Sequence, residues 1–69
     1  MSYHTRQAVL SVIAGRPLPT TAEIAAAVYV APVSALYHLR ALEDLGQIHR
    51  VRRGHVTCWA LAEQAEAAA

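Results

Sequence analysis

The sequence has few of the residues that stabilise small secreted domains or anchor proteins in membranes. It contains one cysteine, Cys58, so it can form neither an internal disulfide framework nor a four-cysteine zinc site. No stretch approaches the roughly 18 consecutive apolar residues that a membrane span needs. The start of the chain, Met1 to Arg6, lacks the charged segment and apolar run of a signal peptide. We therefore expect a cytoplasmic protein that does not enter a membrane.

Lysine is also absent, and charge is sparse. Six arginines oppose five acids, which gives a formal net charge of +1 and a sequence pI near 8.0. Plainly basic nucleic-acid-binding domains have a pI above about 9. Three of the arginines, Arg50, Arg52 and Arg53, nevertheless cluster in one short segment, so the location of charge is more informative than its total.

A chain of 69 residues forms one domain, because single domains run from about 50 to 250 residues. With 55% hydrophobic and 16% charged residues, it can bury a core and is not kept disordered by self-repulsion. We expect one domain over residues 1–61 and an alanine-rich tail over residues 62–69. The tail favours a helix but is too short to form one alone.

Two helices are predicted in the first half of the chain. The first spans residues 5–14, carries an apolar stripe and ends at Gly15. The second spans residues 21–28 and follows Thr20-Thr21-Ala22-Glu23, which fits the Ser/Thr-x-x-Glu capping box. Its predicted inward side chains are Ile24, Ala25 and Val28.

A third helix is predicted over residues 32–45, because Pro32 suits a first helical turn and Gly46 a helix end. On a helical wheel, one face consists of Pro32, Ala35, Leu36, Leu39 and Leu42, and we expect it in the core. The opposite face consists of Val33, Ser34, Tyr37, Arg40, Ala41 and Asp44, flanked by His38. Arg40 could form a pair with Asp44 one turn later.

The pattern then changes to that of a β-hairpin, with strands at residues 47–51 and 56–60. A loop centred on Arg53-Gly54 would pair Ile48 with Trp59, Arg50 with Thr57 and Val51 with Val56. The predicted shared core is Ile13, Ile24, Leu39, Leu42, Ile48 and Trp59.

Residues 20–61 resemble the winged helix-turn-helix domains of small bacterial and phage transcription regulators, including the ArsR-like and MarR-like groups. The most specific part is the His-Leu-Arg-x-Leu-x-x-Leu-Gly-x-Ile run at residues 38–48. The resemblance implies an α+β fold, in which three helices precede a two-stranded β-hairpin wing. It also implies sequence-specific binding of double-stranded DNA by a transcriptional regulator, of repressor rather than activator type.

The resemblance implies three groups of DNA-binding residues. In such proteins the third helix enters the major groove, which here would place Val33, Ser34, Tyr37, His38, Arg40 and Ala41 against the bases. The wing follows the backbone or minor groove, and it carries Arg50, Arg52, Arg53 and His55. The start of the second helix suits a phosphate, which Thr20, Thr21 and Arg16 would contact.

Two residues depart from the family's pattern. Tyr29 stands where such proteins usually carry a glycine in a left-handed conformation, and that conformation costs a non-glycine residue about 1 kcal/mol. Ala31 stands where a serine or threonine caps the third helix, and losing such a cap costs about 1 kcal/mol. We therefore expect a turn that is either strained or built differently from the family's, and a ragged start of the third helix.

Several alternatives compete with DNA binding. The polar face of the third helix could be merely solvated, and the arginine cluster could be a charged hairpin tip that only discourages edge pairing. A winged helix can also serve as a protein-interaction or RNA-contacting module without reading DNA sequence. Salt dependence of binding to random duplex DNA would separate these functions.

Metal binding and catalysis find little support. The cysteine pair of the ArsR-like metal sensors is absent, and His55 and Cys58 would face opposite sides of a strand. His49 could neighbour Cys58 across the hairpin, but two ligands do not make a zinc site. No nucleophile has a base partner at motif spacing, and no glycine-rich phosphate loop is present. We expect no cofactor, no metal and no enzyme activity.

No sensor domain or small-molecule effector site is evident in the sequence. Dimer interfaces usually need about 800 Å² per partner, and neither the first helix nor the alanine-rich tail is long enough to supply it. We therefore expect a monomer in free solution that pairs, if at all, on DNA.

Overall fold

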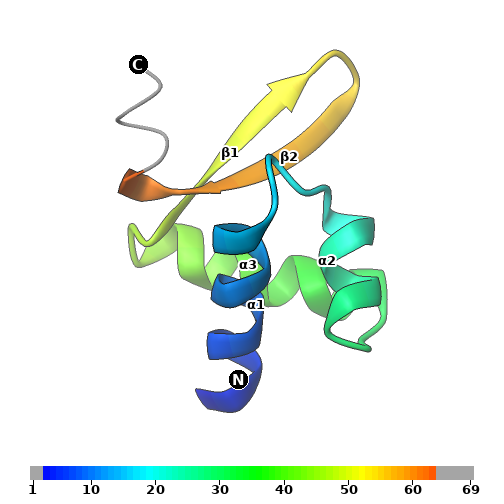
Figure 1. Cartoon of the computed structure of the whole chain (residues 1–69), viewed down its shortest axis with the longest axis vertical. Helices are drawn as coiled ribbons and strands as arrows, with labels where there is room; N and C mark the ends of the chain where they lie inside the picture. Colours follow the sequence, from blue (N-terminus) through cyan, green and yellow to red (C-terminus); the bar gives the residue numbers. More distant parts are fainter. Residues whose placement is uncertain (1–2, 64–69) are drawn as a thin grey trace.

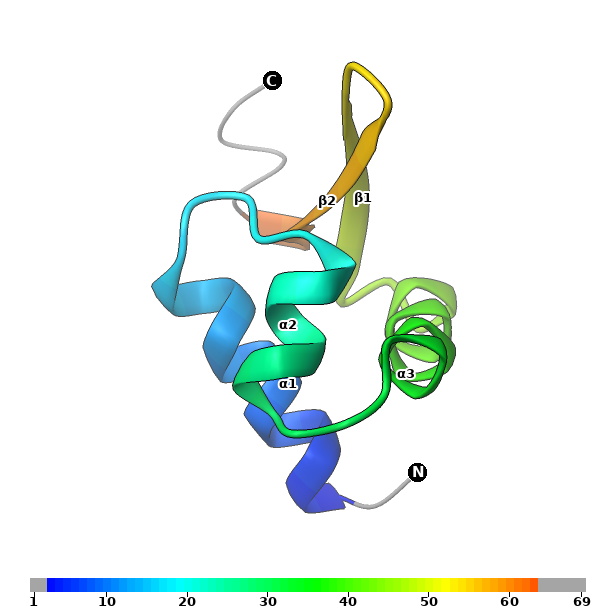
Figure 2. The ribbon, with the colours of Figure 1, turned by 90° about the vertical axis from the view of Figure 1, so that its right-hand side faces the viewer.

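The structure is a computed structural model of the chain and describes residues 3–63. Three helices precede two strands, in the order α1 (Tyr3–Gly15), α2 (Thr21–Ala27), α3 (Pro32–Asp44), β1 (Ile48–Arg53) and β2 (Val56–Leu61). The helices form one body, and the antiparallel hairpin of β1 and β2 projects from it (Figure 1). Figure 2 shows α2 between α1 and α3, with the hairpin rising above α3. The predicted α+β fold, three helices followed by a two-stranded wing, is confirmed.

The first helix, α1, buries Val9 and Ile13 completely, as their helical spacing predicts. It begins two residues before the predicted start at residue 5 and ends at Gly15. Leu10 packs against the core from its edge. α1 therefore supplies one wall of the core.

The capping box at the start of α2 is present. The Glu23 N–H donates to the Thr20 hydroxyl oxygen at 3.1 Å, and the Thr20 N–H donates to a Glu23 carboxylate oxygen at 2.9 Å. These two bonds satisfy backbone donors that a helix start leaves free. Seven residues make a helix that is unstable alone, so the cap and the burial of Ile24 and Ala25 hold it in place.

Of the two alternatives for the turn between α2 and α3, the structure shows the strained one. Tyr29 has φ +59°, in the left-handed region, and its side chain is 94% exposed. Ala31 begins α3 without any side-chain cap, and Pro32 occupies the first turn. Leu18, in the connection before α2, also has positive φ, at +47°.

The core face of α3 matches the wheel at its centre. Ala35, Leu39 and Leu42 are fully buried, and Leu36 is half-buried. Pro32, the first residue of the helix, is exposed rather than buried, because it borders an open hollow. The helix ends at Asp44, one residue before the predicted end.

The hairpin forms, but the predicted register is wrong by two residues. The observed pairs are Ile48 with Leu61, Arg50 with Trp59, Val51 with Cys58 and Arg53 with Val56. The two-residue turn is therefore Gly54-His55, and Gly54 has the positive φ, +63°, that such a turn requires. Since the shift is an even number of residues, each side chain keeps its predicted face although its partner changes.

A third segment pairs with the hairpin, which the sequence did not predict. Thr20 forms an antiparallel bridge with Cys58, and the Trp59 N–H donates to the Pro19 carbonyl oxygen at 3.0 Å. β2 thus lies between β1 and the α1–α2 connection. The base of the hairpin is fixed to the helical body from two sides.

The hydrophobic core lies between the three helices and the base of the hairpin. All six predicted core residues are fully buried, and the complete cluster is Val9, Ile13, Ile24, Leu39, Leu42, Ile48 and Trp59. Beyond β2, the Ala62 N–H donates to the Gln47 carbonyl oxygen at 3.1 Å. Of the predicted tail, residues 64–69 lie outside the described part of the chain.

Within residues 3–63, no single helix is long and apolar enough to cross a membrane. Taken together, α2 and α3 have the length and composition of a membrane span, but the two helices meet at a bend of 106°.

Candidate nucleic-acid interface

The outward face of α3 is exposed and has no internal packing role. Val33 is 76% exposed and Tyr37 69% exposed, and Ser34 and Arg40 are exposed as well. Ala41 is half-buried at the edge of this face. The face offers one guanidinium, two hydroxyls and an apolar surface, which suit hydrogen bonds to base edges and contact with thymine methyl groups.

His38 differs from the rest of the predicted base-contacting set. It is half-buried, and its Nδ1 atom is buried without a hydrogen-bond partner among the described residues. Its ring meets the Tyr37 ring edge-on, with centroids 5.9 Å apart. His38 thus borders the exposed face rather than standing in it.

Arg50 is held by an ion pair instead of standing free on the wing. Its Nε donates to one carboxylate oxygen of Glu43 at 3.0 Å, and its Nη2 donates to the other at 2.9 Å. Its guanidinium also lies 5.3 Å from the centroid of the Trp59 ring. These hydrogen bonds from Arg50 lower the pKa of the Glu43 carboxyl below its ordinary value and raise the pKa of Arg50.

The other two arginines of the wing lie on opposite faces of the hairpin. Arg52 shares the face of Arg50 and Trp59, because side chains two apart in a strand point the same way. Arg53 points to the other face, where it lines a hollow with Glu23 and the α1–α2 connection. The face that carries Arg52 is the one turned toward α3.

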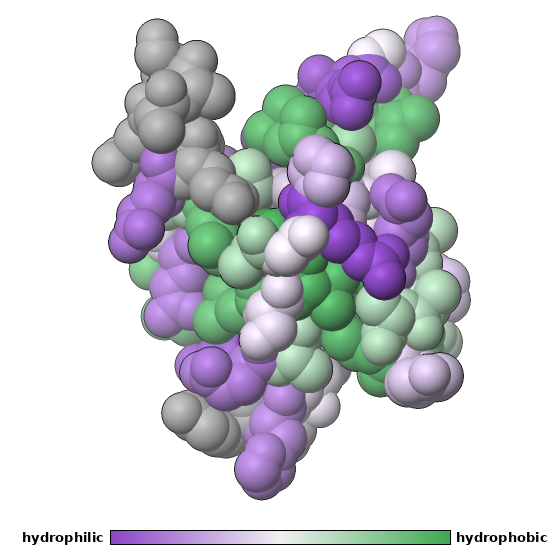
Figure 3. Space-filling view, in the orientation of Figure 1, coloured by the Kyte–Doolittle hydropathy of each residue, from purple (hydrophilic) through white to green (hydrophobic). Residues whose placement is uncertain are grey.

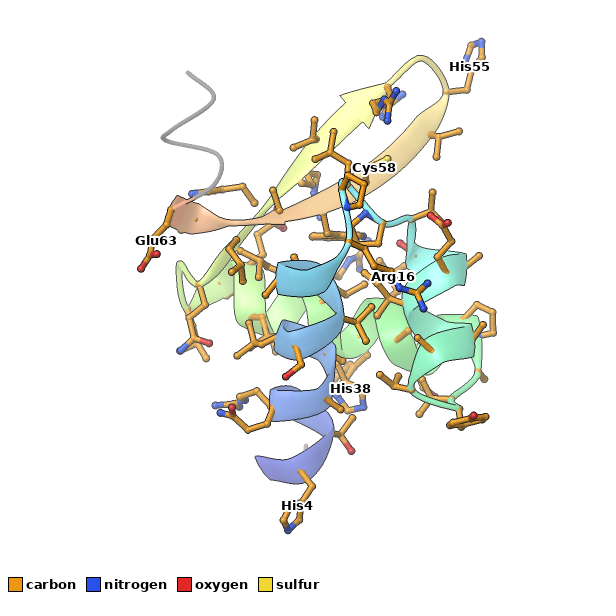
Figure 4. All side chains as sticks on the ribbon, in the orientation of Figure 1. His4, Arg16, His38, His55, Cys58 and Glu63 are labelled. Atoms are coloured by element: carbon orange, nitrogen blue, oxygen red, sulfur yellow. The ribbon has the colours of Figure 1, made fainter. Side chains whose placement is uncertain are left out.

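The end of the hairpin carries hydrophilic residues. Figure 3 shows them at the upper end of the molecule, with hydrophobic residues directly below them. His55 lies in the turn and points away from the molecule (Figure 4). The described structure gives His55 and both tip arginines exposed side chains.

The predicted phosphate-contacting residues gather at the start of α2, but their hydroxyls already have partners. The Thr20 oxygen accepts the capping bond from Glu23, and the Thr21 oxygen accepts a bond from the Trp59 indole N–H at 2.9 Å. Arg16 lies near α2 in Figure 4, and its charge helps to lower the pKa of Glu23, after the hydrogen bonds from Thr20.

An open hollow of about 430 Å³ connects these parts. Its walls are the start of α2, the exposed face of α3 and the inner face of the wing. The residues that line it are Thr21, Pro32, Val33, Leu36, Arg40, Arg50, Thr57 and Trp59. The hollow thus includes at least one member of each predicted group, namely Thr21, Val33, Arg40 and Arg50. Arg53 and Thr20 line a separate hollow instead.

Two predicted side-chain relationships are not present. Among residues 3–63, the ion pair on α3 is Glu43 with Arg50, and no pair joins Arg40 to Asp44. The direct cross-strand neighbour of Cys58 is Val51 rather than His49. In that same part of the chain, no group of three His, Cys, Asp or Glu residues is placed to hold a metal ion.

Glu43 is the residue of this surface that the sequence did not predict. It lies seven positions before Arg50, so neither helix nor strand periodicity connects the two. The signal that could have indicated it is the short Leu45-Gly46-Gln47 connection, which returns the chain beside the last turn of α3.

Comparisons with known proteins agree with this architecture. Residues 6–63 match the family model of FaeA-like protein. Wild-type ZitR of Lactococcus lactis has a TM-score of 0.79 and 26% identity, over 94% of this chain and 44% of ZitR. Wild-type ZitR in complex with DNA has a TM-score of 0.80 and 24% identity, over 94% of this chain and 46% of that one. ZitR is described as a zinc-responsive MarR family member.

A third similar structure is Mb0332 of Mycobacterium bovis, described as a homodimeric winged helix-turn-helix DNA-binding domain of a possible ArsR-family transcriptional regulator. Its TM-score is 0.83 at 22% identity, over 97% of this chain and 61% of that fragment. The chain spans about half the length of the ZitR chains that it matches, from 44% to 52%. No curated protein sequence matches it.

The resemblance to ArsR-like and MarR-like winged helix-turn-helix domains is thus confirmed at the level of fold. The family model covers most of α1 and every later helix and strand. The chain therefore belongs to the FaeA-like protein family.

Proposed function

We propose that this protein binds double-stranded DNA in a sequence-specific manner and regulates transcription. The observation that carries the proposal is the concave surface between α3 and the wing. One wall is the exposed face of α3, whose outward side chains do not pack in the core, and the other wall is the inner face of the wing. That inner face carries Arg50 within the hollow and the exposed Arg52 beyond it. A major groove about 12 Å wide admits a helix presented in this way.

In this proposal α3 enters the major groove. Ser34, Tyr37 and Arg40 donate or accept hydrogen bonds at base edges, while Val33 and Ala41 contact thymine methyl groups. His38 contacts DNA through Nε2, because its Nδ1 is buried. These contacts determine sequence preference.

The wing and the start of α2 contact the backbone. Arg52, Arg53 and His55 follow the phosphates or enter the minor groove, where the potential is most negative. Arg50 belongs to the same surface, where it is paired with Glu43. Thr20, Thr21 and Arg16 contact a phosphate on the other side of α3, through hydroxyl protons, free amides and charge.

The similar structures support this proposal. One ZitR structure is a complex with DNA, and the Mycobacterium bovis fragment is described as a DNA-binding domain. We propose a repressor that acts in the cytoplasm, without enzyme activity, cofactor or small-molecule effector. For oligomeric state we propose a monomer that pairs on DNA with half-sites about one helical turn, ~34 Å, apart.

The Mycobacterium bovis fragment is described as homodimeric. The molecular mass of this protein in solution therefore tests the proposed monomer. Sedimentation without DNA should give the monomer mass at micromolar concentration. A dimer mass would contradict the proposal, and deletion of residues 62–69 would then show whether the tail forms the interface.

Selection of bound sequences from a random duplex pool tests the function directly. We expect the selection to enrich a sequence motif. For random duplex, the logarithm of the binding constant should fall with the logarithm of the salt concentration at a slope of about −3, because Arg16, Arg52 and Arg53 contact the backbone. Tyr37→Ala should reduce discrimination between selected and random DNA, with less effect on random DNA. No enrichment together with a flat salt response would contradict the proposal.

One alternative function is favoured by a specific observation, the apolar share of the α3 face. Val33 and Tyr37 are both largely exposed, and such side chains are also typical of protein–protein contacts. In that case α3 would dock on a partner protein or on structured RNA. This alternative would be favoured if the affinity for duplex DNA depended neither on salt concentration nor on sequence.

A further inference from the structure

Arg50 is fixed from two directions at the point where the wing leaves the helical body. Both carboxylate oxygens of Glu43 accept hydrogen bonds from it, and the Trp59 ring lies beneath its guanidinium. Bidentate pairing defines the orientation of an arginine more tightly than a single bond does. Arg50 therefore has little freedom to turn toward a ligand.

The partners of Arg50 belong to the rest of the fold. Glu43 is in the last turn of α3, and Trp59 is a fully buried core residue on β2. Trp59 in turn donates its indole N–H to Thr21 on α2. A continuous series of contacts thus runs from α3 through both strands of the wing to α2.

Arg50 is also the last side chain of β1 on this face that contacts the body. Ile48, two residues earlier, is in the core, and Arg52, two residues later, is exposed. Beyond Arg50 the inner face of the wing is open, so the Glu43–Arg50 pair is placed to set the angle between the wing and α3.

We propose that the Glu43–Arg50 pair positions the wing against α3, so that Arg52 and the exposed face of α3 contact the same duplex. The inference rests on the proposed function. It assigns Arg50 a positioning role in place of a phosphate contact. It also makes Glu43 necessary for DNA affinity although its charge repels phosphate.

The sign of the effect of Glu43→Gln separates this role from simple electrostatics. Removing an acid close to DNA ordinarily strengthens binding, because repulsion between like charges is removed. If Glu43 positions the wing, its neutralisation weakens binding instead. Asp44→Asn is the matched control, because it removes the same charge one position away and Asp44 has no ion pair among the described residues.

Four variants would be titrated with a selected duplex at several salt concentrations. Three are the single variants Glu43→Gln, Arg50→Met and Arg50→Lys, and the fourth is the double variant that combines Glu43→Gln with Arg50→Met. We expect each to weaken binding by roughly three- to tenfold, with the salt slope within about 0.3 of the wild-type value. The double variant should be no weaker than either single one. Asp44→Asn should leave binding unchanged or strengthen it.

Arg50→Lys is informative because lysine keeps the charge but lacks the planar fork of arginine. A phosphate contact would survive this substitution, whereas bidentate positioning would not. The proposal is overturned if Glu43→Gln strengthens binding as Asp44→Asn does. It is equally overturned if Arg50→Met lowers the salt slope by about 1 while Arg50→Lys preserves it.

A measurement without DNA distinguishes failure of this inference from failure of the proposed function. Urea unfolding is followed by the fluorescence of Trp59, the single tryptophan, for the same single and double variants. Non-additive midpoints show that Glu43 and Arg50 are coupled in the folded protein. Additive midpoints would overturn the pair itself. A coupled pair in a protein that binds no duplex would instead contradict the proposed function.

Discussion

The indole N–H of Trp59 donates a hydrogen bond to the hydroxyl of Thr21 at 2.9 Å, which joins the wing to the first turn of α2. The Trp59 side chain is fully buried, so water has little access to replace this partner. A buried donor without a partner is costly. This bond is therefore a structural reason for a hydroxyl at Thr21, besides any contact with DNA.

Thr21→Val removes the acceptor while keeping the shape of the side chain. We expect the free energy of unfolding to fall by about 1–3 kcal/mol, because the indole N–H loses its partner. Thr21→Ser keeps the hydroxyl and should lose less. Urea unfolding measures both variants, and equal stability of Thr21→Val and the wild type would contradict the prediction.

Leu39→Ala tests the orientation of α3. Leu39 is fully buried, and truncation of such a leucine costs about 2–5 kcal/mol, a large share of the stability of a small domain. Circular dichroism should show an unfolded or barely stable variant. Leu45→Ala, at a position 56% exposed, is the control and should stay folded. If Leu39→Ala is as stable as that control, α3 is rotated and its proposed DNA face is wrong.

Tyr29→Gly should stabilise the protein. The left-handed conformation at Tyr29 costs a non-glycine residue about 1–2 kcal/mol. Glycine removes this strain, but its greater conformational freedom in the unfolded state lowers the stability by about 0.5–1 kcal/mol. Since the side chain is 94% exposed, little packing is lost. We expect a gain of up to about 1 kcal/mol. Tyr29→Ala keeps a Cβ atom and should show no such gain; equal stabilities for the two variants would refute the strain.

The Glu43–Arg50 pair predicts a dependence of stability on acid pH. The hydrogen bonds from Arg50 hold the pKa of Glu43 below its ordinary value of 4.5. A carboxyl whose pKa is lowered by folding stabilises the protein above its unfolded pKa, and that contribution disappears as the pH falls through the folded pKa. The stability difference between wild type and Glu43→Gln should therefore shrink as the pH drops below 4.5. Parallel urea-midpoint profiles from pH 7 to pH 3 would contradict this.

The two tip arginines should differ in their effect on DNA binding. Arg52 lies on the face of the wing turned toward α3, and Arg53 lies on the opposite face near Glu23. We expect Arg52→Ala to weaken binding of random and selected duplex by roughly three- to tenfold and to reduce the salt slope by about 1. Arg53→Ala should weaken binding less, and the double variant should be weakest. A larger loss for Arg53→Ala would mean that the wing approaches DNA from its other face.

The helices and the core follow from the sequence because local chemistry specifies them. Leu39 and Leu42 recur at helical spacing, and Thr20 and Glu23 form a cap within four residues. The register of the hairpin was mispredicted because Arg53-Gly54 and Gly54-His55 both provide a glycine for the turn. The Gly54-His55 turn pairs Trp59 with Arg50, as observed, whereas a loop centred on Arg53-Gly54 would pair Trp59 with Ile48.

The side-chain partners within the candidate site could not be predicted in the same way. Glu43 meets Arg50 only because the chain reverses after α3, and Thr21 meets Trp59 across 38 positions of sequence. Neither relationship has a periodicity. By contrast, the exposed face of α3 was predictable, since it is the complement of the buried stripe.

The position of β2 between β1 and the Pro19–Thr20 connection also bears on how the chain folds during synthesis. Trp59 completes the core, yet it follows all three helices and β1 in the sequence. The apolar faces of the helices are therefore not completely covered until this strand has left the ribosome. Until then α2, with seven residues, has too little helix to persist unaided. We expect a nascent chain that stays largely unstructured and then folds cooperatively once β2 is free to insert.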